Sequence, residues 1–169
     1  VGLLLFSDEI ELFIPPKKGK THVLRIIREL IEFEPKSQKT NLTFALKYLS
    51  NVMKKKAIVF ILSDFVDDGY DNALKIVGKK HDVTGIRVYD KLETELPKLG
   101  MVPMKDVESG QTILVNTNSK TVRRNYRANY LKTVDYFEDS FTKSGSGVIN
   151  NRIDESYVKK LLGYFKRRA

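Results

Sequence analysis

The chain has 169 residues, 41% of them hydrophobic, which is the size and composition of one globular domain with a buried core. Its net charge of +9 favours nucleic acid, an anionic membrane or an acidic protein as a partner, but the basic residues stand at element ends and on helices, as on a solvated surface. The lack of cysteine excludes disulfides, thiolate zinc sites and cysteine nucleophiles, and no apolar run reaches the roughly 18 residues of a membrane-spanning helix. We therefore expect a cytoplasmic location.

Two short strands and two helices are predicted in the first third of the chain. "VGLLLFS" and "DEIELFIPP" have strand patterns and are joined by a turn at residues 8–9. A helix capped by Thr21 follows and ends before Pro35, with apolar residues at the helical spacing. A second helix is predicted over residues 40–54.

The middle of the chain predicts a parallel sheet. "AIVFILS", residues 57–63, has no polar alternation and is rich in β-branched side chains, as in a strand that is covered on both faces. A helix over about 70–80 and the strand "VTGIRVYD" follow, and together they form a βαβ unit with a right-handed crossover. Beyond them we predict a strand in "GQTILVNT", a long helix over about 121–142 and a last helix capped by Asp154.

Aspartates stand where the predicted parallel strands end. Asp64 and Asp90 directly follow strands, and ligands of open α/β sheets lie beyond the carboxyl ends of the strands. Asp64 follows an apolar run, so we expect a half-buried carboxylate that needs a partner such as Mg²⁺. Thr40 offers a hydroxyl for the same cation, and a helix cap explains this threonine equally well. The three aspartates within residues 67–71 are expected to form a turn and to cap the next helix.

These segments carry a resemblance to a known family. "TNLTFALKYL" followed by "AIVFILSDF" resembles the second and third metal-site segments of the von Willebrand factor A fold. More narrowly, "VGLLLFSDEIELFIPPKKGK", "TNLTFALKYL", "VFILSDFVDD", "KKHDVTGIRVYDKLETELPKLG" and "DVESGQT" occur in the order seen in the DUF58 family of bacterial proteins. The closing "VKKLLGYFKRR" also fits that family, so the resemblance covers nearly the whole chain.

The resemblance implies a fold and an incomplete metal site. The fold is a Rossmann-like α/β domain of the von Willebrand factor A type, with a mainly parallel sheet flanked by helices, over residues 1–169. Its metal-ion-dependent adhesion site uses an Asp-x-Ser-x-Ser loop, a threonine and an aspartate; Thr40 and Asp64 match the last two. No segment here matches the loop, so we expect a fragment that lacks its first strand and helix. The implied cation is Mg²⁺ or Mn²⁺, and we expect this fragment to bind none.

The implied function is protein binding without catalysis. The family resemblance implies a scaffold module that works with a MoxR-type AAA+ ATPase, and a parent protein associated with a membrane. The basic, aromatic run "RRNYRANYLKTVDYF" has its aromatic residues at helical spacing, which favours core packing, so nucleic acid is not an expected partner. His81, one of two histidines, precedes a strand and is expected to be a hydrogen-bonded structural residue.

An enzymatic alternative stays open. In it, Asp64, Asp67 and Asp90 bind one or two Mg²⁺ ions in a phosphoesterase or nuclease, and the positive surface attracts the polyanion. Against it, the chain has no evident general base and no phosphate-binding loop, because "KKGKT" lacks the glycine that such a loop needs at position 14. No Ser-His-Asp arrangement or G-x-S-x-G motif is present either.

Overall fold

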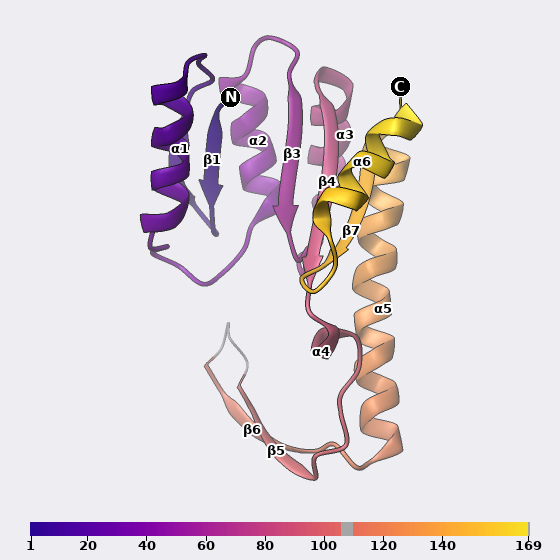
Figure 1. The fold of residues 1–169 in the computed structure, drawn as a ribbon. Coiled ribbons are helices and arrows are strands. Elements are labelled where there is room, and N and C mark those ends of the chain that lie inside the picture. The colour runs from indigo at the N-terminus through magenta and orange to yellow at the C-terminus, as the bar shows by residue number, and fades with distance from the viewer. Residues whose placement is uncertain (106–109, 169) are drawn as a thin grey trace.

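The computed structural model describes residues 1–105 and 110–168. In these residues, β3, β4 and β7 form a parallel sheet flanked by helices, and two antiparallel hairpins, β1–β2 and β5–β6, stand apart from it (Figure 1). The predicted α/β class is therefore confirmed. The elements in chain order are β1 Leu3–Phe6, β2 Ile10–Ile14, α1 Lys20–Glu32, α2 Leu42–Val52, β3 Ile58–Ser63, α3 Asp71–Lys80, β4 Asp82–Tyr89, α4 Lys91–Thr94, β5 Met101–Lys105, β6 Thr112–Asn116, α5 Lys120–Lys143, β7 Gly147–Arg152 and α6 Tyr157–Arg168.

The parallel sheet has its three strands in one direction. β3 pairs with β4 from Ile58 opposite Asp82 onward, and β4 pairs with β7 from Thr84 opposite Gly147 onward. The predicted β3–α3–β4 unit is therefore present. All three strands end at one edge of the sheet, which we call the carboxyl edge; the opposite edge, where they begin, is the amino edge. Parallel strands place their chain ends in this way, and it is the geometry that brings loops from distant parts of the sequence together.

One side of the sheet carries the core. Helices α2, α3 and α5 cover this side, while α6 lies over β4 and β7 on the other (Figure 1). Gly85 in β4 leaves room for two phenylalanine rings of α5, because a Cβ there would come within 3 Å of both. The buried cluster consists of Leu42, Leu46, Ile61, Phe65, Tyr70, Ala73, Leu74, Val77, Val83, Phe137 and Phe141. Aliphatic residues from the helical stripes thus meet an aromatic group on α5.

Strand β7 was missed by the sequence analysis, which placed only a break between two helices there. Its sequence "GVINNR" contains no continuous apolar run. The amide nitrogens of both asparagines have acceptors: that of Asn150 donates to Glu138 Oε1 at 2.7 Å and that of Asn151 to the carbonyl of Arg152 at 3.2 Å. Tertiary pairing with β4, which a local pattern does not report, makes this segment a strand.

Three predicted helix caps are wrong. The N-cap of α1 is Gly19, not Thr21, and no side chain caps that helix. The N-cap of α2 is Asn41, whose Oδ1 accepts a hydrogen bond from the N–H of Phe44 at 2.9 Å, so Thr40 lies one residue outside the helix. Asp154 forms an ion pair with Arg152 instead of capping α6.

The second hairpin extends away from the sheet together with the first half of α5 (Figure 1). Its strand β6 was predicted, but β5, with the sequence "MVPMK", was not. A proline in a five-residue strand removes one backbone donor, so the local pattern is a weak strand signal. No helix among the residues that the structure describes is both long and apolar enough to cross a membrane.

Candidate functional site

The carboxyl end of β3 turns sharply and exposes Asp64. The Ser63 hydroxyl donates to Asp64 Oδ1 at 3.3 Å and accepts from the N–H of Phe65 at 3.0 Å, while Val66 N–H donates to the same carboxylate oxygen at 3.2 Å. Phe65 is buried at φ +58°, and its ring stacks on Phe137 with 4.2 Å between centroids. A bulky residue in the left-handed region is strained, so the buried ring must hold this turn in place.

A second carboxylate joins this tip to α2. Asp67 Oδ2 accepts a hydrogen bond from the N–H of Leu42 at 2.7 Å, and its Oδ1 accepts from Asp68 N–H at 2.8 Å. The N–H groups of a first helical turn have no partner within the helix and favour negative charge. Asn41 N–H donates to the carbonyl of Ser7, just beyond β1, at 2.9 Å. The ends of β1 and β3 therefore meet at the start of α2.

Thr40 and Asp64, the two predicted metal ligands, lie on these joined segments. Thr40 directly precedes the N-cap of α2, and Asp64 lies three residues before Asp67. The side chains of Thr40 and Asp64 are both exposed. The expectation that Asp64 is half buried is wrong, because the turn at Phe65 directs it to the surface. The hydrogen bond between Leu42 and Asp67 holds both segments at the carboxyl edge.

Asp67, Asp71 and Asp90 have structural partners. Asp90 Oδ1 caps α4 by accepting from Leu92 N–H at 2.7 Å, and Glu93 Oε1 accepts from the N–H of Asp90 at 2.8 Å. Asp71 accepts a hydrogen bond of 2.6 Å from the hydroxyl of Tyr136, which holds the pKa of Asp71 below its usual value. Asp67 caps α2, whereas the sequence analysis expected it to cap the following helix. Within residues 1–105 and 110–168, no three His, Cys, Asp or Glu side chains are grouped to hold a metal ion.

A buried arginine near the same edge was missed by the sequence analysis. Arg87 in β4 is almost fully buried, with its guanidinium 4.5 Å from the ring centre of Tyr89 and 5.0 Å from that of Tyr130. It also donates to the hydroxyl of Tyr130 at 3.2 Å and lies 3.9 Å from Glu93. A single charged residue in the apolar run "VTGIRVY" was the available signal. This arginine links β4 to α5 through stacking and to α4 through its ion pair with Glu93.

One side of β3 is uncovered, although the sequence predicted cover on both faces. Ile58, Phe60 and Leu62 are 68%, 42% and 62% exposed, whereas Ile61, which points to the core, is 7% exposed. These three residues lie on the side of α6, because the rings of Phe60 and Phe165 are in edge contact at 6.1 Å. We call Ile58, Phe60, Leu62 and the exposed α6 residues Val158, Leu162 and Phe165 the open face. A cluster of this kind is typical of a surface that another segment covers.

Helix α1 has an exposed apolar side, and strands β1 and β3 each have an unpaired edge in the described part of the chain. Ile26 is the one buried residue among the thirteen of α1. The exposed apolar residues of this helix are Val23, Leu24, Ile27, Leu30 and Ile31. Among the described strands, β1 pairs with β2 alone and β3 pairs with β4 alone, so each leaves one edge without a backbone partner. An amphipathic helix with its apolar side in solvent and an unpaired apolar strand are both unfavourable in isolation.

Comparison with solved structures shows a shared fold. The structure of BatB from Bacteroides thetaiotaomicron is similar with a TM-score of 0.55 and 14% sequence identity, covering 99% of this chain and 77% of that chain. An aerotolerance-related membrane protein from Bacteroides fragilis is similar with a TM-score of 0.50 and 14% identity, covering 98% of this chain and 78% of that one. At this level of identity the likeness concerns the fold alone.

Comparison with curated sequences gives the family. The uncharacterized protein Rv1480 of Mycobacterium tuberculosis is 26% identical over 113 residues, which are 65% of this chain and 36% of that protein. This chain therefore spans little more than a third of that relative. The uncharacterized protein MAV169 of Mycobacterium avium is 21% identical over 162 residues, 92% of this chain and 93% of its own length. The model of the family DUF58, a protein family of unknown function, matches residues 1–135, and the chain belongs to this family.

Proposed function

We propose that the chain is a non-enzymatic protein-interaction module whose docking site is the carboxyl edge around Thr40 and Asp64. The observation that carries the proposal is the hydrogen bond between Leu42 and Asp67, which holds two exposed oxygen-bearing side chains on adjacent segments. The turn at Phe65 supports it, because backbone strain is concentrated at functional positions. Asp67 and Asp90, two of the three carboxylates that a two-metal enzyme would need, are engaged at helix starts, whereas Asp64 is exposed and is bonded through Oδ1 to Ser63 and Val66 of its own turn.

In this proposal the fold is of the von Willebrand factor A type and a further strand and helix precede Val1 in the parent protein. Two observations support that arrangement: β1 and β3 each have an unpaired edge, and their ends meet at the start of α2. A strand inserted between them would join the hairpin and the parallel sheet, and the helix after it would cover the open face. The loop after such a strand would end at the carboxyl edge, beside Thr40 and Asp64.

The proposed mechanism is docking through a cation. An upstream loop, Thr40 and Asp64 hold Mg²⁺ or Mn²⁺, for which carboxylate and hydroxyl oxygens are suitable ligands, and a carboxylate of the partner completes the coordination. The partner that the family resemblance favours is a MoxR-type AAA+ ATPase. Because such a partner consumes ATP, the proposal places this domain in the cytoplasm.

Cation binding is the first test. We expect the parent polypeptide to bind Mg²⁺ or Mn²⁺ in a calorimetric titration, and the Asp64→Ala variant to lose at least about tenfold in affinity, because it loses a charged ligand. Asp68→Ala is the matched control, since Asp68 is an exposed aspartate four residues away, and its affinity should match that of the wild type. The 169-residue chain alone should bind weakly or not at all. Equal affinities of the Asp64→Ala and wild-type proteins would rule out the proposed site.

The same proteins separate docking from catalysis. A nuclease would cleave single- or double-stranded nucleic acid in the presence of Mn²⁺ and would lose that activity in the Asp64→Ala variant. The docking proposal expects no cleavage by either protein. Metal-dependent cleavage that is lost in the Asp64→Ala variant would overturn the non-enzymatic assignment, although it would still support a cation site at Asp64.

A further inference from the structure

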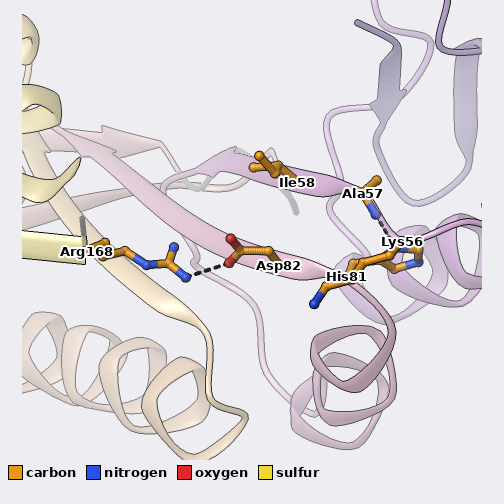
Figure 2. A pocket seen from close by; sticks show the side chains of 6 residues that line it. All are labelled: Lys56, Ala57, Ile58, His81, Asp82 and Arg168. Carbon is orange, nitrogen blue, oxygen red and sulfur yellow. Dashed lines mark hydrogen bonds and ion pairs between the residues drawn. The ribbon is translucent and has the colours of Figure 1, made fainter.

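A cavity lies at the amino edge of the sheet, opposite the docking site. It has a volume of about 540 Å³ and is lined by Lys56, Ala57, Ile58, His81, Asp82 and Arg168 (Figure 2). These residues come from three places: the start of β3, the start of β4 and the end of α6. The size suits a small ligand or the head of a larger one. The polar groups that line it are mostly hydrogen-bond donors.

His81 supplies a donor without an acceptor. The side chain is 3% exposed, and its Nδ1 accepts a hydrogen bond from the N–H of Ala57 at 3.3 Å, as expected of a structural histidine. Burial and the neighbouring Lys80 lower the pKa of His81, so its ring is neutral near pH 7. In a neutral ring whose Nδ1 accepts, the proton must be on Nε2. Nε2 is buried and has no hydrogen-bond partner in the described residues, and an unpaired buried donor is costly.

The acidic group of the cavity is already neutralised. Asp82 Oδ1 accepts from Arg168 at 2.7 Å (Figure 2). The same guanidinium donates to the hydroxyl of Tyr164 at 2.8 Å. Lys56 is exposed at the cavity wall and adds a positive charge. The cavity therefore combines two cations, one paired carboxylate and one unused donor, which gives it a net positive charge.

The fold concentrates more positive charge around this cavity. The basic segments 54–56, 79–80 and 166–168 are far apart in the sequence, yet they follow α2, end α3 and end α6. Lys80 donates to Ser50 at 2.6 Å and Arg168 pairs with Asp82, so the three helix ends lie at the amino edge. Basic residues at helix C-termini also complement the helix dipole, which accounts for their presence there. The dipole does not account for the unpaired Nε2–H of His81.

We propose that this cavity binds an oxyanion of the phosphate class, whose oxygen accepts the hydrogen bond from His81 Nε2–H while Lys56 and the surrounding basic segments supply the attraction. The site is distinct from the docking edge and does not depend on the proposed function. Two sources share this chemistry, a soluble phosphomonoester and the headgroup of an anionic lipid.

Nuclear magnetic resonance of the two histidine rings tests the proposal. The chain has only His22 and His81, and His22 bonds to the carbonyl of Val1 outside the cavity, so it is an internal control. We expect inorganic phosphate to shift the His81 ring signals saturably and to leave those of His22 in place. Lys56→Gln should weaken the apparent affinity about tenfold, as expected for the loss of a charged contact, and Lys132→Gln on α5 should not change it.

Controls decide between specific binding and general charge attraction. Chloride at the same ionic strength should not reproduce the shift of His81. An unmoved His81, equal shifts of His22 and His81, or no effect of Lys56→Gln would each overturn the proposal. Vesicles of phosphatidylcholine with and without phosphatidic acid then identify the source of the phosphate group. Binding to the phosphatidic acid vesicles that Lys56→Gln weakens supports a lipid headgroup, whereas a phosphate effect without vesicle binding supports a soluble phosphomonoester.

Discussion

Replacing Gly85 by alanine is expected to lower the free energy of unfolding by about 3 kcal/mol, the upper part of the range for overpacking a core. A Cβ at Gly85 would lie 2.6 Å from Phe141 and 2.7 Å from Phe137, closer than carbon atoms approach. Both rings are fully buried, that of Phe137 stacked on Phe65 and that of Phe141 in edge contact with it, so neither can move aside without opening the core. The entropic gain of replacing glycine, up to about 1 kcal/mol, is too small to offset this clash.

A glycine without neighbours is the matched control. Gly163 lies inside α6, and a Cβ there would meet no atom within 4 Å. Gly163→Ala should therefore raise the free energy of unfolding, by up to about 1 kcal/mol, because alanine is the better helix former. Both variants are measured by urea denaturation. If Gly85→Ala changed stability as little as Gly163→Ala, α5 would not pack against β4 as described.

The second large effect separates the two sides of β3. Ile61→Ala should cost about 3 kcal/mol of unfolding free energy, since it leaves a cavity among buried residues of α2, α3 and α5. Leu62→Ala, one residue further, should change it by no more than about 0.5 kcal/mol, as for a surface substitution. The measurement is chemical denaturation of the 169-residue chain. An equal loss in both variants would show that the open face is buried in solution, for example against a second copy.

Strong local patterns predicted most of the fold. The continuous apolar run of β3 and the helical spacing of α2, α3 and α5 carry their own periodicity, and the structure confirms these elements. β7 and β5 were missed, because "GVINNR" and "MVPMK" become strands only through pairing with a neighbour. The helix α4 had a readable signal, Asp90 followed three residues later by Glu93, which form the capping box.

The candidate site could be predicted only in part. The position of Asp64 after β3 follows from the sequence, but its exposure depends on the left-handed turn at Phe65, which no residue pattern indicates. The link between Asp67 and Leu42 spans 25 residues and requires the folded arrangement. The same holds for the amino-edge cavity, where His81 and Arg168 are far apart in the sequence. The composition shows a net charge of +9, but it does not show that basic segments gather at the amino edge of the sheet.

At the open face, the structure differs from what the apolar sequence of β3 predicts. An apolar strand such as β3 predicts cover on both sides, yet Ile58 and Leu62 are in solvent. The outer side of β3 is thus apolar in sequence and uncovered among the described residues. In the proposed arrangement, an upstream strand and helix provide this cover.

Binding of a purified MoxR-type ATPase is the most direct measurement of the docking account. With the parent polypeptide immobilised, the account predicts binding in Mg²⁺ that weakens at least about tenfold when EDTA removes the cation or when Asp64 is replaced by alanine. The Asp68→Ala variant should bind like the wild type. Binding of equal strength with EDTA and in the Asp64→Ala variant, or no binding at all, would contradict the account.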